Sequence, residues 1–175
     1  MGCITSASFA VLVNGEPSYL FHCERGLKQG CPLSPLLFVL IMEGLSLALK
    51  HKQEEGLLTG IKVSRYIHIL HLLFADDILI MTKASIEEWK EISIVLQLFC
   101  NAMGLHINAH KTTLLQFGAN QQVLGGIKAL FHFQIQDLEK GFMYLGYFLK
   151  MGRYKTEDWL WLLEKIEKRI KLWCN

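Results

Sequence analysis

Two adjacent acidic residues, Asp76 and Asp77, are the part of the sequence best suited to chemistry. They interrupt an otherwise apolar stretch, Ile67 to Met81, which reads IHILHLLFADDILIM. Because successive side chains of a strand point to opposite faces, a regular strand would turn one of the two carboxylates toward its apolar side. Burying an unpaired carboxylate is costly in free energy. We therefore predict that the pair lies at the tip of a hairpin with two apolar strands.

Two neighbouring carboxylates repel each other unless a cation lies between them. Carboxylate oxygens are hard ligands of the kind that Mg²⁺ prefers. The pair therefore indicates a magnesium-binding tip. An acidic turn without a ligand is the alternative interpretation, and the choice between the two depends on the rest of the chain.

A loop and a helix precede this tip and must help to position it. The loop RGLKQGCPLSP, Arg25 to Pro35, contains two glycines, two prolines and two cations, so its backbone can approach a ligand closely. Ser34 followed by Pro35 predicts the start of a helix over 35–51. That helix is apolar nearly all round in its first half, so we expect it to be largely buried. Taken alone, the loop is equally typical of a simple connection.

A hairpin is predicted ahead of this loop. Asn14-Gly15 is the strongest short turn signal in the chain, because both residues of the turn need positive φ. The strands on either side of it run from Phe9 to Val13 and from Tyr19 to Cys23.

The elements after the acidic pair are predicted from capping and periodicity. Ser85 and Glu88 form a capping box before a helix over 86–103, which Gly104 ends. The later elements are a strand-like segment at 105–115, a glycine-containing loop at 116–129, an aromatic strand pair at 142–149 bent at Gly146, and a helix that begins at Thr156.

Composition limits the class of protein. The length of 175 residues fits one domain, and 51% hydrophobic residues can bury a sizeable core. The longest apolar run, Leu36 to Met42, is seven residues, far below the roughly 20 needed to span a bilayer. The five cysteines are odd in number and scattered, which predicts an intracellular, reducing compartment and leaves nucleus and cytoplasm open. A net charge of +2 is too small to indicate nucleic acid by itself.

Four stretches together resemble the successive motifs of reverse transcriptases. They are RGLKQGCPLSPLLF (25–38), FADDILI (74–80), GLHINAHKT (104–112) and YLGYFLK (144–150). The series is most similar to the LINE-type, non-long-terminal-repeat retrotransposon enzymes of plants, and it extends from about residue 9 to the end of the chain. Cys31 departs from the pattern, since these elements often carry an acidic residue there.

The resemblance implies an α/β (α+β) fold, the palm of a right-hand polymerase. Its antiparallel sheet would contain the acidic hairpin and be backed on one face by helices 35–51 and 86–103. Residues 1–150 would form the palm and 151–175 the start of a helical thumb, with the fingers missing. The palm is also partial, because the family needs a further Asp on an upstream strand and residues 1–75 contain no Asp.

The activity implied is RNA-directed DNA polymerisation by two-metal nucleotidyl transfer. Asp76 and Asp77 match the carboxylates that bind two Mg²⁺ ions, and Lys111 matches the general acid that protonates the leaving pyrophosphate. The other matching positions are Arg25, Lys28, Gln29 and Gly30 for nucleotide and template, and Tyr144, Leu145 and Gly146 for the primer grip.

The implied partners are an RNA template, a DNA primer and deoxynucleoside triphosphates, with no membrane and no indication of an oligomeric state. We expect residues 1–175 alone to be inactive, because of the missing Asp strand. Two alternatives remain, a catalytically dead nucleic-acid-binding or maturase-like remnant, and a fragment without function.

Overall fold

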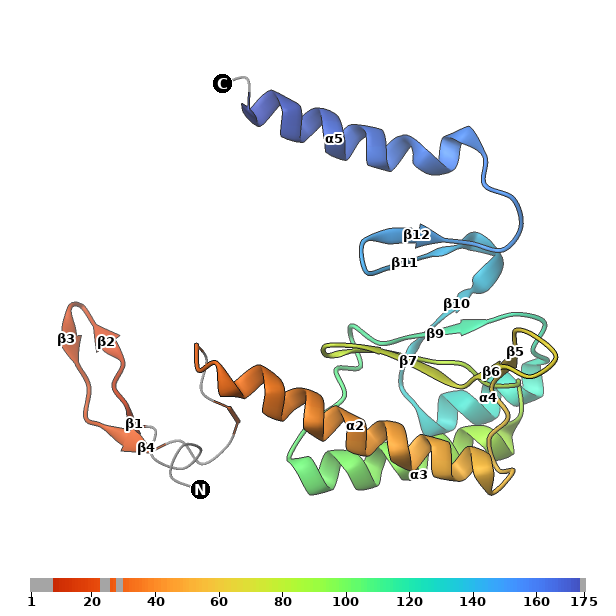
Figure 1. Cartoon of the computed structure of the whole chain (residues 1–175), viewed down its shortest axis with the longest axis horizontal. Helices are drawn as coiled ribbons and strands as arrows, with labels where there is room; N and C mark the ends of the chain where they lie inside the picture. The colour runs from red at the N-terminus through yellow and green to blue at the C-terminus, as the bar shows by residue number, and fades with distance from the viewer. Residues whose placement is uncertain (1–7, 23–25, 28–29, 174–175) are drawn as a thin grey trace. The chain divides into compact units, whose positions relative to one another are not determined.

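The computed structural model describes residues 8–22, 26–27 and 30–173 (Figure 1). The chain forms two compact units, Met1–Ile107 and Asn108–Asn175, and each is described by itself. Both units contain helices and strands, which agrees with the predicted α+β class. The predicted division into a palm over 1–150 and a thumb over 151–175 is a functional one and stays a prediction.

The first unit contains four short strands and then two long helices that flank a hairpin. Its elements are β1 (Ser8–Phe9), β2 (Leu12–Val13), β3 (Glu16–Pro17), β4 (Phe21–His22), α2 (Leu33–Glu54), β5 (Ile61–Lys62), β6 (His68–Ile69), β7 (His71–Phe74), β8 (Asp77–Ile80) and α3 (Ile86–Met103).

Within the described part of the chain, every sheet has only two strands, and the pairs in the first unit are β1–β4, β2–β3, β5–β6 and β7–β8, all antiparallel. The predicted central sheet is therefore wrong for these residues. The strands of this unit other than β7 and β8 are two residues long, too short to extend the β7–β8 pair into a wide sheet. The predicted Asn14-Gly15 turn is confirmed, with φ of 53° and 90°. The predicted first strand is divided between β1 and β2, and the strand paired across the turn, β3, begins before the predicted Tyr19.

Helix α2 begins earlier than predicted. Pro32 is its N-cap, so Ser34 is not the cap, and Pro35 lies in the first turn, where its missing N–H leaves no bond unmade. One side of the C-terminal half is buried and provides Met42, Leu45, Ser46 and Leu49.

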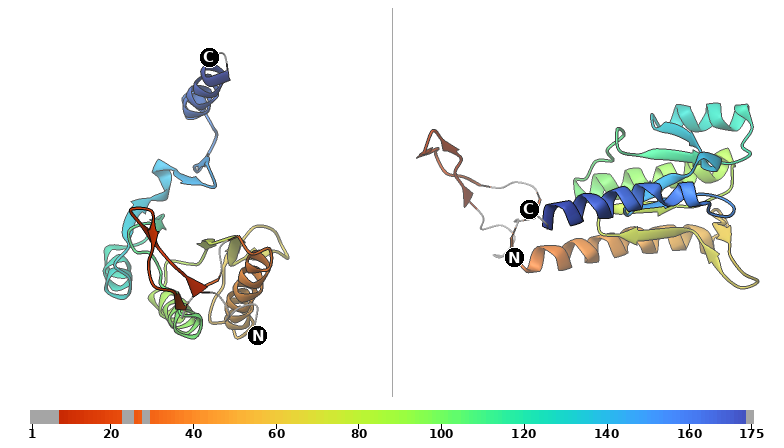
Figure 2. Two further views of the ribbon diagram at one scale, coloured as in Figure 1. Left: turned by 90° about the vertical axis from the view of Figure 1, so that its left-hand side faces the viewer. Right: turned by 90° about the horizontal axis from the view of Figure 1, so that it is seen from above.

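The residues of the N-terminal half of α2 are mostly exposed or half-buried, so the prediction that it is largely buried is wrong. Leu36 and Leu40 are 67% and 69% exposed, and this stretch extends beyond α3 in both Figure 1 and Figure 2. Of the described helices, α2 is the one long and apolar enough to cross a bilayer, a test that core helices also pass.

Helix α3 has the predicted bounds. Ser85 is its N-cap, with Oγ accepting a hydrogen bond from the Glu88 N–H at 3.5 Å, and Gly104 ends it at a φ of 66°. Only half of the capping box forms, however, because the Glu88 carboxylate bonds to residues outside the helix.

The core of the first unit lies where α2 packs on α3. The fully buried side chains there are Leu45, Leu49, Leu58 and Ile92. Figures 1 and 2 show both helices on the same side of the β7–β8 hairpin, as predicted.

The second unit contains β9 (Thr113–Gln116), α4 (Gln121–Leu130), β10 (Gln134–Asp137), β11 (Phe142–Tyr144), β12 (Tyr147–Leu149) and α5 (Leu160–Trp173), with 3₁₀ turns at Leu138–Lys140 and Thr156–Trp159. Strands β9 and β10 are parallel. The antiparallel pair β11–β12 is the predicted aromatic hairpin.

Three predictions for the second unit are corrected. The strand expected at 105–115 begins only at Thr113, because Asn108 forms a turn in which its Oδ1 accepts from His110 N and Lys111 N. The loop expected at 116–129 contains α4, since parallel strands need a crossover and Asn120 caps that helix through Val123 N at 2.8 Å.

The last helix is the third of these corrections. Lys155, and not Thr156, is the N-cap of the 3₁₀ turn that precedes α5. The Asp158 carboxylate accepts a hydrogen bond from Lys155 N at 2.6 Å, and this bond fixes the start of the turn. No residue of α5 is buried.

Candidate active site

The acidic pair lies at the tip of the β7–β8 hairpin, as predicted. Phe74 pairs with Asp77, which leaves Ala75 and Asp76 as a two-residue loop and makes Asp77 the first residue of β8. Ala75 has a φ of 51°, in the left-handed region that non-glycine residues rarely adopt. Such strain is found preferentially at functional sites.

The two carboxylates are free to bind a ligand. Asp76 and Asp77 are both exposed, and within the described residues neither has a hydrogen-bond or ion-pair partner. Their chemistry fits a hard cation such as Mg²⁺. The fit is partial, because the described part of the chain contains no group of three or more His, Cys, Asp or Glu side chains that could hold a metal.

The base of the hairpin, opposite the acidic tip, is anchored to helix α2. Met81 N donates to Leu70 O at 2.7 Å and so extends the ladder by one bond beyond the β7–β8 register. Ser46 Oγ on α2 is 2.9 Å from His71 Nε2 on β7. Burial and the nearby Lys50 charge lower the pKa of His71, which favours the neutral imidazole. The hairpin is therefore held at its base and open at its tip.

A groove of about 440 Å³ runs along this base between α2 and the strands, lined by Ser46, Lys50, Gln53 and residues 68–73. It does not include the acidic tip. Because the carboxylates and not the groove have the chemistry of a cation site, we take the tip as the candidate active site.

The predicted nucleotide and template residues are only partly described. Arg25, Lys28 and Gln29 lie outside the described residues. Gly30 is exposed with a φ of 78°, and a Cβ added there would meet nothing within 4 Å. Its backbone is therefore accessible to a ligand.

Lys111 lies in the second unit. Its side chain is exposed, and its backbone N–H is held in the Asn108 turn at 3.2 Å from Asn108 Oδ1. The turn presents the ammonium group to solvent. The predicted general-acid role stays a prediction.

The predicted primer-grip residues form the tip of the β11–β12 hairpin. Tyr144 pairs with Tyr147, so Leu145 and Gly146 make a two-residue turn with φ of 50° and 80°. Positive φ at both positions is the type I′ pattern. Leu145 is 39% exposed, and the tip presents backbone and an apolar side chain.

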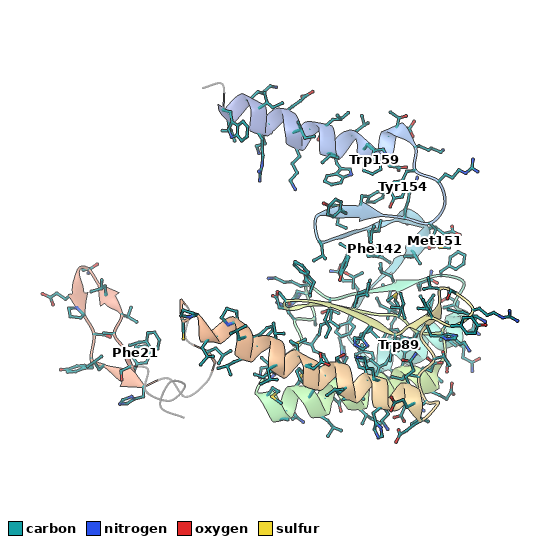
Figure 3. The ribbon with its side chains drawn as sticks, viewed as in Figure 1. Phe21, Trp89, Phe142, Met151, Tyr154 and Trp159 are labelled. Atoms are coloured by element: carbon teal, nitrogen blue, oxygen red, sulfur yellow. The ribbon has the colours of Figure 1, made fainter. Side chains whose placement is uncertain are left out.

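Residues just downstream anchor this second hairpin. Tyr154 Oη donates to Phe148 O at 3.0 Å, and Lys150 forms an ion pair with Asp158. Figure 3 shows Tyr154 and Trp159 close together, with ring centroids 5.3 Å apart. The ion pair with Lys150 and the hydrogen bond from Lys155 N hold the pKa of Asp158 below its usual value.

Sequence reasoning missed two features of the candidate site. One is the left-handed backbone of Ala75 at the acidic tip, where the chain has no glycine or asparagine to predict a positive φ. The other is the buried role of Glu88, which the capping pattern concealed. The sequence signal for Ala75 is a short connection between apolar strands. Glu88 has no comparable signal, because Thr82 is six residues away and Thr59 is 29 residues away in the chain.

Residues 2–149 match the family model described as "Reverse transcriptase (RNA-dependent DNA polymerase)". The chain is 52% identical over 67 residues to an uncharacterized mitochondrial protein of Arabidopsis thaliana, covering 38% of this chain and 55% of that protein. It is 29% identical over 111 residues to the retrovirus-related Pol polyprotein from type-1 retrotransposable element R2 of Popillia japonica, covering 63% of this chain and 17% of the polyprotein.

The family match and the retrotransposon relative agree with the resemblance seen in the four motifs. The chain spans about half the length of the first relative and less than a fifth of the second. With a family model matched over most of its residues, this chain belongs to the reverse transcriptase family.

Proposed function

We propose that this chain provides the palm and the start of the thumb of a LINE-type, RNA-directed DNA polymerase. The observation that carries the proposal is the pair of exposed carboxylates, Asp76 and Asp77, which have no partner among the described residues and lie at the tip of an anchored hairpin. In a member of this family, such a tip is suited to nucleotidyl transfer.

Asp76 and Asp77 would hold magnesium at the tip. When bound, two Mg²⁺ ions supply positive charge that stabilises the attacking and leaving oxygens of an in-line displacement. The protein contributes position, because a carboxylate at a hairpin anchored to two helices moves little. Lys111 would donate a proton to the departing pyrophosphate.

The remaining predicted residues would bind the substrates. Gly30, with Arg25, Lys28 and Gln29, would lie against the incoming deoxynucleoside triphosphate and the RNA template. Tyr144, Leu145 and Gly146 would hold the DNA primer end.

The last helix would add sequence-independent contacts to phosphates. Its cations are Lys165, Lys168, Arg169 and Lys171. The proposed setting is intracellular and reducing.

The test is primer extension with magnesium, an RNA template, a DNA primer and deoxynucleoside triphosphates. Residues 1–175 alone should give no product, because residues 1–75 contain no Asp and two-metal catalysis needs a further carboxylate. A longer polypeptide that supplies an upstream Asp strand should extend the primer. Absence of any product from that polypeptide would contradict the proposal.

A nucleic-acid-binding remnant or maturase-like module is the second candidate. The absence of Asp from residues 1–75 is the observation that favours it. RNA binding by a polypeptide with the upstream Asp strand, without magnesium-dependent synthesis, would support this candidate over the first.

A further inference from the structure

Glu88 is a buried carboxylate that the proposed chemistry does not use. It lies in the first turn of α3 and is only 7% exposed. An ionised carboxylate this far from water is destabilising unless hydrogen bonds or charges compensate for its lost hydration. Its partners therefore indicate what it does.

The Glu88 carboxylate accepts hydrogen bonds from two segments outside its own helix. Thr59 donates twice, from its N–H at 3.3 Å and from Oγ1 at 2.8 Å, and Thr82 donates once from Oγ1. Burial alone would raise the pKa of Glu88, but the bonds from Thr82 and Thr59 outweigh it and lower the pKa. The group is therefore ionised near neutral pH and satisfied by neutral donors.

Thr82 connects Glu88 to the end of the acidic hairpin. It directly follows Met81, whose N–H makes the last bond of the β7–β8 ladder with Leu70 O. A hydrogen bond to Thr82 therefore fixes the point at which the chain leaves β8.

Thr59 connects the same carboxylate to the chain that leads into the hairpin. The next residue, Gly60, has a φ of 68°, and a Cβ there would lie 2.7 Å from Ile69 O. That close approach seats Gly60 against the end of β6, and the chain continues from there through Leu70 into β7. One carboxylate thus holds the segments at both ends of the hairpin.

Helix α2 also contacts Thr59 and α3. Gln53 Nε2 donates to Thr59 O at 3.3 Å. Lys52, one residue earlier, forms an ion pair with Glu91 of α3 at 3.2 Å. Thr59 is therefore held from both helices, and the helices are linked to each other beside it.

We infer that Glu88 is a positioning residue, which holds the base of the β7–β8 hairpin through Thr59 and Thr82 and so fixes where the tip presents Asp76 and Asp77. The structural part of this inference needs only the contacts above. Its consequence for catalysis rests on the proposed function.

Hydrogen–deuterium exchange of chain 1–175 tests the structural part. Glu88→Gln replaces one acceptor oxygen by a donor NH₂ that faces the threonine donors. Exchange of the 71–81 amides should become about tenfold faster or more, the effect of losing one hydrogen bond to a charged group. The matched control is Glu87→Gln, an exposed neighbour whose carboxylate accepts a hydrogen bond from Ser85 and not from the hairpin, and it should leave these amides unchanged.

Two substitutions of Thr82 test the same contact without altering the carboxylate. Thr82→Val keeps the shape but lacks the hydroxyl, and it should speed exchange over 71–81, whereas Thr82→Ser should not. This pair decides the matter if Glu88→Gln does not fold. Wild-type exchange at 71–81 in a folded Glu88→Gln or Thr82→Val protein would overturn the inference. Faster exchange spread equally over the whole first unit would also overturn it, because that is the effect of general destabilisation.

The catalytic part is tested in a polypeptide that extends a primer. Glu88→Gln should lower kcat about tenfold while KM for the nucleotide changes less than about twofold, since position and not substrate contact is lost. Thr82→Ser should restore the rate lost in Thr82→Val. An unchanged kcat in Glu88→Gln would overturn the catalytic part. If no polypeptide extends a primer while the exchange result holds, the proposed function fails and the positioning role stands.

Discussion

The hairpins β7–β8 and β11–β12 both close with short loops but have different supports. Each closes with a two-residue loop, and each loop has a non-glycine residue at positive φ, Ala75 at 51° and Leu145 at 50°. The first tip is acidic, whereas the second presents an apolar side chain and a glycine.

The supports differ in their distance along the sequence. The base of β7–β8 bonds to Ser46 of α2 through His71 and to Glu88 of α3 through Thr82. Glu88 also accepts a hydrogen bond from Thr59, in the segment ahead of β5. The base of β11–β12 is held by Tyr154 and Asp158, both within ten residues of the strand. The tip proposed to hold an ion is thus built on a packed unit, while the tip proposed to grip a flexible primer is held locally.

The largest expected effect comes from removing the charge of Asp76 at the first tip. In a polypeptide that extends a primer, Asp76→Asn should abolish extension and leave primer-template affinity nearly unchanged, because duplex affinity comes chiefly from cations on phosphates. Filter binding and extension assays on one preparation measure both. Wild-type extension by Asp76→Asn would refute the carboxylate assignment.

Lys111 offers a smaller effect from the second unit. Lys111→Ala should slow the chemical step by about 10–10⁴-fold, the reach of one general acid. Single-turnover kinetics separate this step from nucleotide binding. A complete loss in Lys111→Ala beside an active Asp76→Asn would reverse the proposed roles.

Substitutions of two glycines test whether the two hairpins are supported separately. Gly60→Ala should destabilise the first unit by about 2–4 kcal/mol, since its Cβ would meet backbone atoms at left-handed φ. Gly141→Ala should destabilise the second unit by about 2–4 kcal/mol, because its Cβ would meet the Phe148 ring and also the backbone oxygen of Leu149 at 2.9 Å.

Segment-resolved hydrogen exchange in urea measures the two units separately. The control is Gly44→Ala inside α2, where a Cβ meets nothing within 4 Å, and it should stabilise by about 0.5–1 kcal/mol. An equal loss of protection in both units from either of the first two substitutions would contradict the separate supports.

The smallest effect is in the pH dependence of stability. Burial raises the pKa of Glu88, but the bonds from Thr82 and Thr59 lower it overall, below its ordinary value of 4.5. The folded state therefore binds fewer protons at Glu88 than the unfolded state, so this stabilisation is full above about pH 4.5 and is lost as pH falls through the folded pKa.

Urea unfolding of wild type and Glu88→Gln from pH 7 to pH 3 tests this. The difference in free energy of unfolding should shrink as pH falls below 4.5, the ordinary value. Asp158→Asn should show the same sign at lower pH, since the pKa of Asp158 is lowered from 3.8. A difference that grows on acidification would show that the carboxylate of Glu88 is not the stabilising form.

Local signals in the sequence determined the elements at the candidate site. The apolar strands around Asp76 require a hairpin, Ser85 and Gly104 bound α3, and Leu145-Gly146 closes a turn. Each of these depends on residues within about one turn or one strand of the chain. The family likeness implied the proposed activity and the proposed site residues.

Only the tertiary structure decided which polar and apolar groups find partners. The backbone N–H of Glu88 bonds locally to Ser85. Its carboxylate instead bonds to Thr59, 29 residues away. In the same way, burial of α2 is confined to its C-terminal half, and a glycine-containing stretch becomes the crossover helix α4. These outcomes depend on segments distant in sequence, because hydrogen bonds and burial are set by what the folded chain places beside each residue.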